Sequence, residues 1–371
     1  MTVRDSDDEL RAFLQERTKY PSSTAMAYAI GEPETTVRAR YTRARQRLGS
    51  EFPQLPPDGF RVKGTSTLYD AGGDVKLTWV KTREDERSIQ DLVSEIKEAL
   101  DGYVPTDLSP KTPETTDSDI AILYPLADWH VGLLSWKKET GHNYDLKIAQ
   151  TVIKAAMGRL IACAPNSSQG VVVGLGDLLH ADNFEATTNR SKNVLDVDGR
   201  YPKILRASTE LVIYTVDLAL QKHESVLLRI LPGNHDEQSA LAVTLALALY
   251  FQNNPRVTVD DDAGRFWWWE WGKCLLGATH GDKAKMKDLP LIMAARNPAA
   301  WGRTKFRYIH TGHIHQESGI EKNGVTVESH RSPVAPDAWH VGMGYGAGRS
   351  VSAITYHKEH GEIIRQKVKI V

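Results

Sequence analysis

The residues best suited to chemistry in this sequence stand directly after five short apolar segments. Asp128 and His130 follow the first segment, and Asp177 and His180 follow the second. The three later segments are followed by polar residues of the same kinds, namely Asn234, His235, Asp236, His280, His313 and His315. Oxygen ligands mixed with imidazoles, and without thiolates, are typical of sites for Mn²⁺, Fe or Zn²⁺. Because these ligands outnumber the needs of one ion, the sequence predicts two divalent metal ions, with Mn²⁺ as the first choice.

Strand-like and helical segments alternate through this part of the chain. The apolar strand-like segments are residues 120–127, 170–176, 225–231, 274–279 and 306–312. The helical segments between them include residues 145–164, 201–223 and 239–252. This alternation predicts an α/β fold with helices on the faces of a sheet. In such a sheet, functional side chains gather beyond the carboxyl ends of the strands. We therefore expect the polar residues to share one crevice.

The ordered motifs DWH, GDLLH, GNHD, THGD and GHIH resemble those of the calcineurin-like metallophosphoesterase superfamily, over residues 120–316. The resemblance implies two packed mixed β-sheets flanked by helices, with a dinuclear metal centre. It implies that one ion is bound by Asp128, His130 and His315. It implies that the other ion is bound by Asn234, His280 and His313, and that Asp177 bridges both.

The resemblance leaves His235 free of metal and facing the scissile phosphate, with Asp236 placed to orient its imidazole. Two cations would acidify a bridging water, and the hydroxide would attack phosphorus in line with the leaving oxygen. His235 would stabilise the transition state or protonate the leaving group. The expected reaction is therefore hydrolysis of a phosphoester. The alternative for His235 is a buried histidine bound to a backbone carbonyl.

The motif GDLLH ends in His180, where the superfamily commonly has Asp or Asn. In this motif, and in the stretch ADWHVG, the chain is similar to the repair-exonuclease branch, the nuclease subunit of double-strand-break repair complexes. The resemblance implies that His180 lies near the substrate, which makes it a candidate catalytic residue that contacts the substrate or supports a metal ligand. The alternative is an ordinary histidine at the start of a helix.

The start of the chain predicts a small helical domain at residues 1–50. Helical segments at 6–19, 22–31 and 34–49 are separated by short turns, which suggests a helix-turn-helix. The third segment is basic, and its arginines are expected to contact DNA phosphates: they are Arg38, Arg40, Arg43, Arg45 and Arg47. The alternative is a solvated helix, or one packed on the acidic first helix with Asp7, Asp8 and Glu9.

Residues 51–118 are expected to contain a β-hairpin at 60–83, a helix at 84–103 and a linker, ahead of a catalytic domain at 119–371. Within that domain, the long connection after His180 is expected to face the substrate. Its candidate phosphate contacts are Arg190, Lys192 and Arg200, and the alternative is an ordinary surface loop. A later segment with His330, Arg331, Trp339 and His340 is expected to form a wall of the active site.

The composition is that of an ordinary soluble protein. The chain has 371 residues, a formal net charge of −1 and a hydrophobic fraction of 41%. These values give no general attraction to nucleic acid or membrane, so any preference for DNA must be local. The start, MTVRDSDDEL, lacks the basic and apolar regions of a signal peptide. We expect a cytoplasmic protein without a membrane partner, and the sequence is compatible with a homodimer.

A helix-turn-helix domain ahead of a two-metal body resembles in layout the metallophosphoesterases of phages and prophages. The sequence thus predicts a metal-dependent DNA nuclease, most similar to an exonuclease. One alternative is a phosphatase or small-nucleotide phosphodiesterase whose first domain only mediates assembly. The other is a DNA-binding protein in which the phosphoesterase body is a scaffold.

Overall fold

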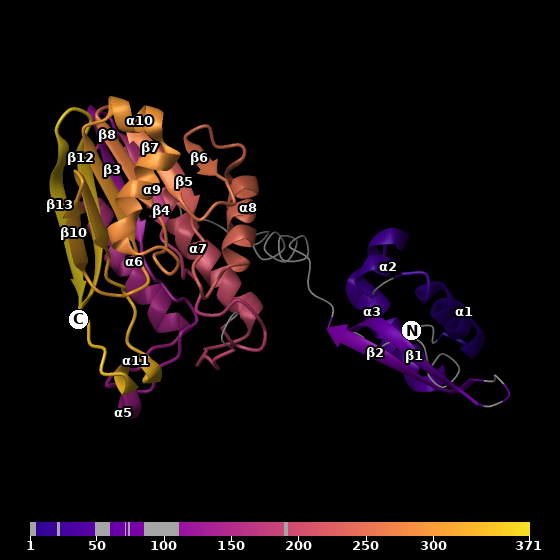
Figure 1. Cartoon of the computed structure of the whole chain (residues 1–371). Coiled ribbons are helices and arrows are strands. Elements are labelled where there is room, and N and C mark those ends of the chain that lie inside the picture. The colour runs from indigo at the N-terminus through magenta and orange to yellow at the C-terminus, as the bar shows by residue number, and fades with distance from the viewer. Residues whose placement is uncertain are drawn as a thin grey trace. The chain divides into compact units, whose positions relative to one another are not determined.

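The computed structural model describes residues 5–20, 23–48, 60–70, 72, 75–84, 111–188 and 192–371. Its contacts divide the chain into two units, Met1–Ser88 and Ile89–Val371 (Figure 1). The helix predicted at 84–103 lies outside the described residues apart from its first position, and so does the linker up to residue 110. The domain boundaries expected at residues 50 and 118 stay predictions.

The first unit contains the three helices predicted for the start of the chain. They are α1 (Asp7–Arg17), α2 (Ser23–Ile30) and α3 (Glu34–Leu48). Helix α1 begins with a capping box, in which Ser6 Oγ accepts the Glu9 backbone N–H and the Glu9 carboxylate accepts the Ser6 N–H at 2.6 Å. Apolar residues of the three helices form one core, made of Leu10, Phe13, Leu14, Met26, Ala27, Val37, Tyr41, Ala44 and Leu48.

The predicted hairpin follows in the same unit. Strand β1 (Phe60–Tyr69) pairs antiparallel with β2 (Val75–Glu84). In the turn, Asp70 Oδ1 accepts the Gly72 N–H at 2.8 Å. An Asx-type turn of this kind is the local chemistry that Asp and Gly favour between strands.

The second unit contains a six-stranded mixed sheet in the order β13-β12-β3-β4-β5-β6. Its parallel strands are β3 (Asp117–Leu126), β4 (Ser167–Gly174), β5 (His223–Ile230) and β6 (Val257–Asp260). Its antiparallel strands are β12 (Arg349–His357) and the edge strand β13 (Gly361–Ile370). Both faces of the central strands are covered, which explains why their sequences are continuously apolar rather than alternating.

The same unit contains a five-stranded mixed sheet in the order β10-β11-β9-β8-β7. Its strands are β7 (Trp267–Trp271), β8 (Cys274–Ala278), β9 (Phe306–Thr311), β10 (Ser318–Lys322) and β11 (Val325–Ser329). Strands β8, β9 and β11 are parallel, whereas β7 and β10 are antiparallel to their neighbours. Trp267 of β7 is buried between the sheets, so this tryptophan is a core residue.

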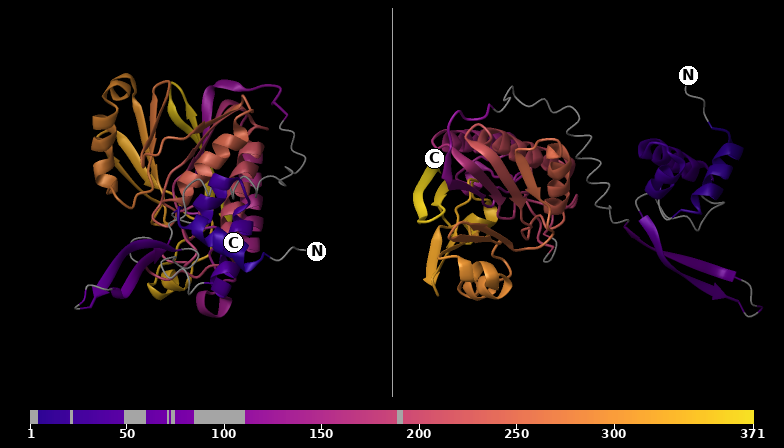
Figure 2. Two further views of the ribbon diagram at one scale, coloured as in Figure 1. Left: turned by 90° about the vertical axis from the view of Figure 1, so that its right-hand side faces the viewer. Right: turned by 90° about the horizontal axis from the view of Figure 1, so that it is seen from above.

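The two sheets pack face to face, and helices cover their outer faces (Figures 1 and 2). Apolar side chains from both sheets form the inner core, including Leu123, Val171, Val173, Leu276 and Tyr356. The six-stranded sheet is covered by α6 (Leu146–Ala162), α7 (Tyr201–Ala219) and α8 (Ser239–Phe251). The five-stranded sheet is covered by α9 (Leu289–Arg296) and α10 (Pro298–Arg303). This confirms the predicted fold class of two packed mixed sheets flanked by helices.

Several short elements complete the second unit. They are α5 (Lys137–Thr140), the 3₁₀ helix η2 (Met286–Asp288) and α11 (Ala338–Gly342). In the part of the chain that the structure describes, no helix has both the length and the apolar character needed to span a bilayer.

Candidate metal centre

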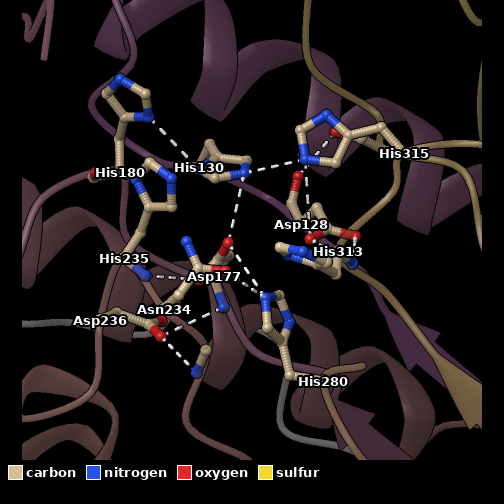
Figure 3. Close-up of polar contacts among 12 residues, drawn as sticks. Asp128, His130, Asp177, His180, Asn234, His235, Asp236, His280, His313 and His315 are labelled. Carbon is tan, nitrogen blue, oxygen red and sulfur yellow. Dashed lines mark hydrogen bonds and ion pairs between the residues drawn. The ribbon is translucent and has the colours of Figure 1, made fainter. Parts of the chain in front are cut away.

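The five polar clusters predicted at strand ends lie together in the second unit (Figure 3). Strands β3, β4 and β5 of the six-stranded sheet lead into Asp128, His130, Asp177, His180, Asn234, His235 and Asp236. Strands β8 and β9 of the five-stranded sheet lead into His280, His313 and His315. All five strands are parallel within their sheets, so the loops at their carboxyl ends bring these side chains together.

Asp128, His130 and His315 form the first ligand group. One possible ligand atom from each of the three residues lies within 4.8 Å of the others. The Nε2 atoms of His130 and His315 are 3.0 Å apart, and His315 Nε2 lies 3.6 Å from Asp128 Oδ1. The Asp128 carboxylate also accepts the His313 backbone N–H at 2.9 Å, which joins the ends of β3 and β9.

The second ligand group contains Asp177, His280 and His313, again within 4.8 Å of one another, with Asn234 beside them. His280 Nδ1 lies 2.9 Å from the Leu175 carbonyl, to which it donates its proton. In the neutral ring, Nε2 then presents a lone pair to Asn234 Oδ1 at 3.0 Å and Asp177 Oδ2 at 3.2 Å. Three electron-pair donors this close are stable only with a cation or an extra proton among them.

Asp177 lies between the two groups. Its Oδ2 is 3.8 Å from His130 Nε2 and 3.2 Å from His280 Nε2. Its Oδ1 accepts the His235 backbone N–H at 2.8 Å, so only one oxygen is committed to the chain. The position of Oδ2 is therefore suitable for a ligand shared by two cations.

The backbone at the predicted ligands is unusual. Five of the eight non-glycine residues with positive φ in the described ranges are predicted ligands: Asp128 (49°), His130 (37°), Asp177 (52°), His313 (71°) and His315 (53°). A left-handed conformation costs a side-chain-bearing residue about 1–3 kcal/mol and is concentrated at functional sites. The left-handed backbone is thus concentrated at the residues that form the two ligand groups.

Glycines let the strand-end loops approach one another. A Cβ on Gly233 would lie 2.0 Å from Asp177 Oδ1, and one on Gly312 would lie 2.6 Å from Asp128 Oδ2. Neither glycine has a positive φ, so the need is for space and not for a special conformation.

His235 lies beside both groups without belonging to either of them. Its Nδ1 is 2.8 Å from the His180 carbonyl, and its ring is edge-on to His130, with 4.8 Å between centroids. The alternative of a histidine bound to a backbone carbonyl is therefore realised, and it is compatible with a catalytic role because Nε2 is left for a substrate. Among the described residues, the partner that orients His235 is this carbonyl.

Asp236 does not orient His235 as expected. Its fully buried carboxylate accepts four backbone N–H groups, at distances between 2.6 and 3.2 Å, from Asp177, Leu178, Leu179 and Gly233. These donors belong to the loops after β4 and β5. Asp236 therefore ties the two loops together and holds the ligands Asp177 and Asn234 through the backbone.

His180 is buried beside the first ligand group. Its Nδ1 lies 3.2 Å from His130 Nδ1, and its ring stacks on that of His235, with 5.4 Å between centroids and 18° between planes. A ligand imidazole usually donates its second N–H to a neighbour that fixes the ring. His180 is therefore placed to accept the Nδ1–H of His130 and to fix the orientation of that ring.

Burial and charge set the protonation of the centre. Burial raises the pKa of Asp128 to about 8 and lowers the pKa of both His180 and His315 to about 3. Burial lowers the pKa of His280, but the adjacent Asp177 carboxylate outweighs it and raises that pKa to about 10. With these pKa values Asp128 and His280 carry protons at neutral pH, and a divalent cation would displace those protons, because its ligands must be ionised carboxylates and neutral imidazoles. The donor set fits the predicted metal ions.

The predicted phosphate contacts outside the centre are placed differently. Arg190 lies outside the described residues, while Lys192 and Arg200 are exposed on the connection that leads to α7. In the first unit, Arg40 and Arg43 pair with Asp5 at 3.3 and 3.8 Å, and Arg47 pairs with Asp7. The alternative in which α3 packs on the acidic start of the chain is therefore present in the structure.

Arg38 and Arg45 are the remaining predicted DNA contacts. Both lie on α3 and are half-buried in the first unit. Contact between any of these arginines and DNA stays a prediction.

Two further polar groups lie in the second unit, and the sequence pattern singled out His330 and His340 but not their partners. Asp337 Oδ1 lies 2.7 Å from His340 Nδ1, and the His340 ring stacks on His315, with 4.9 Å between centroids. His310, Glu328 and His330 also converge, but Arg365 pairs with both oxygens of Glu328 at 2.7 and 2.9 Å. These partners belong to none of the strand-end motifs: Asp337 caps the start of α11, and His310 and Glu328 lie in β9 and β11.

Comparisons with known proteins give the following results. No protein-family model matches the chain, and no curated protein matches it. Among solved structures, a predicted phosphoesterase from Streptococcus pneumoniae is similar over 68% of this chain and 98% of its own, with 10% identity and a TM-score of 0.28. Zinc-bound Vps29 from Entamoeba histolytica is similar over 67% of this chain and 98% of its own, with 11% identity and a TM-score of 0.29.

An archaeal phosphodiesterase is similar over 67% of this chain and 99% of its own, with 12% identity and a TM-score of 0.32. A putative 5'-nucleotidase from Staphylococcus aureus is similar over 68% of this chain and 54% of its own, with 10% identity and a TM-score of 0.32. At this level of similarity, the chemistry of the chain has to be inferred from its own side chains.

Proposed function

We propose that the second unit hydrolyses phosphodiester bonds with two divalent cations held by the two ligand groups. The observation that carries the proposal is the position of Asp177 Oδ2, 3.8 Å from His130 Nε2 and 3.2 Å from His280 Nε2. One carboxylate oxygen that faces both groups is the arrangement required of a bridging ligand. When bound, the cations would neutralise charge on the phosphate and lower the pKa of an attacking water.

His235 would act on the phosphate itself. Because Nδ1 donates to the His180 carbonyl at 2.8 Å, Nε2 is the ring atom left for the substrate. In the protonated ring, Nε2 donates a hydrogen bond to a phosphoryl oxygen or a proton to the leaving oxygen. The stacked ring of His180 restricts rotation of His235 and supports this orientation.

We propose DNA as the substrate, with α3 as a second contact for its phosphates. The side chains of Arg43 and Arg47 are 54% and 51% exposed, even though they pair with Asp5 and Asp7. Exposed ion pairs contribute only about 0–1 kcal/mol, so a DNA phosphate can replace these carboxylates at little cost. An exonuclease-like action is part of this proposal.

The same ion pairs favour a second candidate function. If Asp5 and Asp7 are the lasting partners of Arg40, Arg43 and Arg47, the first unit serves assembly and not DNA binding. The second unit would then be a phosphatase or a small-nucleotide phosphodiesterase. A DNA-binding protein with an inactive body is a third candidate, and it requires that no metal be bound.

The test uses the full chain loaded with Mn²⁺, end-labelled single- and double-stranded DNA, and bis(4-nitrophenyl) phosphate as a small phosphodiester. We expect cleavage of both substrate types, and we expect His235→Ala to keep its metal while losing cleavage. Metal content by elemental analysis is measured in parallel. Full activity of His235→Ala would refute the mechanism, and hydrolysis of small esters alone would favour the second candidate.

A further inference from the structure

Aromatic side chains next to the metal centre form a surface that the proposed reaction does not use. The His340 ring lies face to face with the predicted ligand His315, with 4.9 Å between centroids and 16° between planes. Asp337 fixes His340, since its Oδ1 accepts the His340 backbone N–H at 2.8 Å and lies 2.7 Å from Nδ1. His340 therefore extends the centre outward in a fixed position.

Two larger rings continue from His340 toward solvent. Trp339 contacts His340 edge-on with 5.0 Å between centroids, and Tyr345 lies 5.6 Å from Trp339. The exposed fractions of Trp339 and Tyr345 are 59% and 47%. Large rings left in water beside a candidate catalytic site indicate a binding surface, because burying them would be favourable. We name Trp339, His340 and Tyr345 the aromatic platform.

Helix α5 lies beside the platform and adds positive charge. Ser135 Oγ donates to the Pro336 carbonyl at 2.6 Å, and α5 and α11 lie side by side in Figure 1. Trp136, just before α5, is 59% exposed, with Lys138 Nζ 5.5 Å from the centre of its ring. Flat exposed rings together with lysines match a ligand that has both π faces and negative charge.

We propose that the aromatic platform stacks on an unpaired nucleobase of the strand whose phosphate occupies the metal centre. This inference rests on the proposed phosphodiesterase function and narrows its substrate to single-stranded or locally opened nucleic acid. Because His340 touches the ligand His315, a nucleotide adjoining the bound phosphate can reach the platform. Bases inside a duplex offer no free face, so a strand must be unstacked before it binds there.

The test measures binding and not turnover. A labelled single-stranded oligonucleotide is titrated with the full-length His235→Ala protein in Mn²⁺, and fluorescence anisotropy gives the dissociation constant. We expect Trp339→Ala to weaken binding about tenfold, the effect of losing one base–aromatic stack. Trp339→Phe should keep most of the affinity because it keeps a ring. The matched control is Leu291→Ala, which removes a 71% exposed apolar side chain on α9.

A strand of the same length made of abasic residues separates stacking from phosphate binding. The His235→Ala protein should bind the abasic strand about tenfold more weakly than the normal oligonucleotide. Adding Trp339→Ala should then cause no further loss of affinity for the abasic strand. Equal losses of affinity for both strands in Trp339→Ala would overturn the inference. The inference would also be overturned if Trp339→Ala changed the oligomeric state, measured by sedimentation, without changing oligonucleotide binding.

The proposed function is tested separately by hydrolysis of bis(4-nitrophenyl) phosphate by the protein with His235 intact. Base-dependent binding without hydrolysis would support the platform and reject the function. Hydrolysis together with binding that does not depend on Trp339 would support the proposed function and reject the role of the platform.

Discussion

At the residue scale, the two carboxylate oxygens of Asp177 have different roles, one structural and one as a candidate metal ligand. One oxygen accepts the His235 N–H at 2.8 Å, and the other faces the imidazoles of His130 and His280. The residue has a φ of 52° and is buried, so neither its backbone nor its charge is stable in this position without compensation. A pair of cations would supply that compensation.

We predict that Asp177→Asn loses metal from both groups. An amide removes the negative charge that both cations would share, so metal affinity should fall by more than about 100-fold, beyond the loss seen for partners outside the ligand set. Elemental analysis after gel filtration measures the metal bound per chain.

The matched control for this change is Asp261→Asn, since Asp261 is an exposed carboxylate on the loop after β6. It should bind as much metal as the unchanged protein. If Asp177→Asn also keeps its full metal content, Asp177 does not bridge the two groups.

At the scale of elements, the centre depends on how closely the loops after the parallel strands approach one another. The carboxylate of Asp236 holds the loops after β4 and β5 together by four backbone hydrogen bonds. Gly233 stands in the same contact, with no room for a side chain. The ligands are thus positioned by the packing of one loop on another as well as by the strands.

Gly233→Ala should disrupt this contact. The added Cβ would lie 2.0 Å from Asp177 Oδ1 and 2.3 Å from the Asp177 backbone nitrogen, so the loops must separate. We expect a loss of about 1–3 kcal/mol in the free energy of unfolding, together with loss of metal. Urea denaturation and elemental analysis measure the two effects. Gly302→Ala in α10 is the control, because outside its own helix no atom lies within 4 Å of the added Cβ; it should keep its metal and should not lower the free energy of unfolding.

The six-stranded sheet contains a pH-sensitive contact away from the metal centre. His223 is buried at the start of β5, where Nε2 lies 2.8 Å from the Tyr124 hydroxyl and Nδ1 lies 2.7 Å from Ser167 Oγ. Burial lowers the pKa of His223 to about 3. In the unfolded chain the pKa of histidine is about 6.5, so below that pH only the unfolded state takes up the proton.

The free energy of unfolding should therefore fall as pH falls from about 6.5 to about 3, with His223 contributing up to about 1.4 kcal/mol per pH unit. Urea denaturation at pH 7 and pH 5, with EDTA present to remove metal effects, measures this slope. His223→Gln should be less stable at pH 7 but lose less stability on acidification. His142→Gln, at an exposed position, should keep the original slope. An unchanged slope in His223→Gln would contradict the assignment.

At the scale of the whole molecule, a unit with a candidate metal centre is joined in one chain to a small unit with a basic helix. Arg40, Arg43 and Arg47 of α3 are partly neutralised by Asp5 and Asp7, so the positive charge that α3 offers to a partner is smaller than its sequence suggests. The formal net charge of −1 gives no further attraction. Within α3, the candidate DNA contacts are these three arginines together with Arg38 and Arg45.

We predict that replacing Arg43 and Arg47 together by Gln weakens binding of duplex DNA and flattens its salt dependence. Each lost phosphate contact lowers the slope of log K against log salt by about 0.9, so the slope should fall by about 1 to 2. Titrations of the full chain between low and high salt measure it. Arg11→Gln, which removes an ion pair with Asp8 on α1, should leave the slope unchanged. If the double variant loses stability but keeps the slope of the unchanged protein, Arg43 and Arg47 form ion pairs and do not contact DNA.

The sequence by itself determined which residues would gather and at which strand ends. Apolar runs that end in Asp, His or Asn predict parallel strands whose carboxyl ends share a crevice, and the strands and helices follow those predictions closely. The signal is local, because each motif directly follows the strand that positions it. The same locality explains why the capping box of α1 and the turn of the first hairpin are predictable.

Only the tertiary structure decided how these residues divide their roles. Asp236 binds loop backbone instead of His235, His180 offers its carbonyl to His235, and His340 stacks on His315. Each contact joins loops that follow different strands: β4 and β5 in the first two cases, and β9 and β11 in the last. Such pairings depend on how the loops of neighbouring strands fit together, and no spacing within one motif encodes that fit.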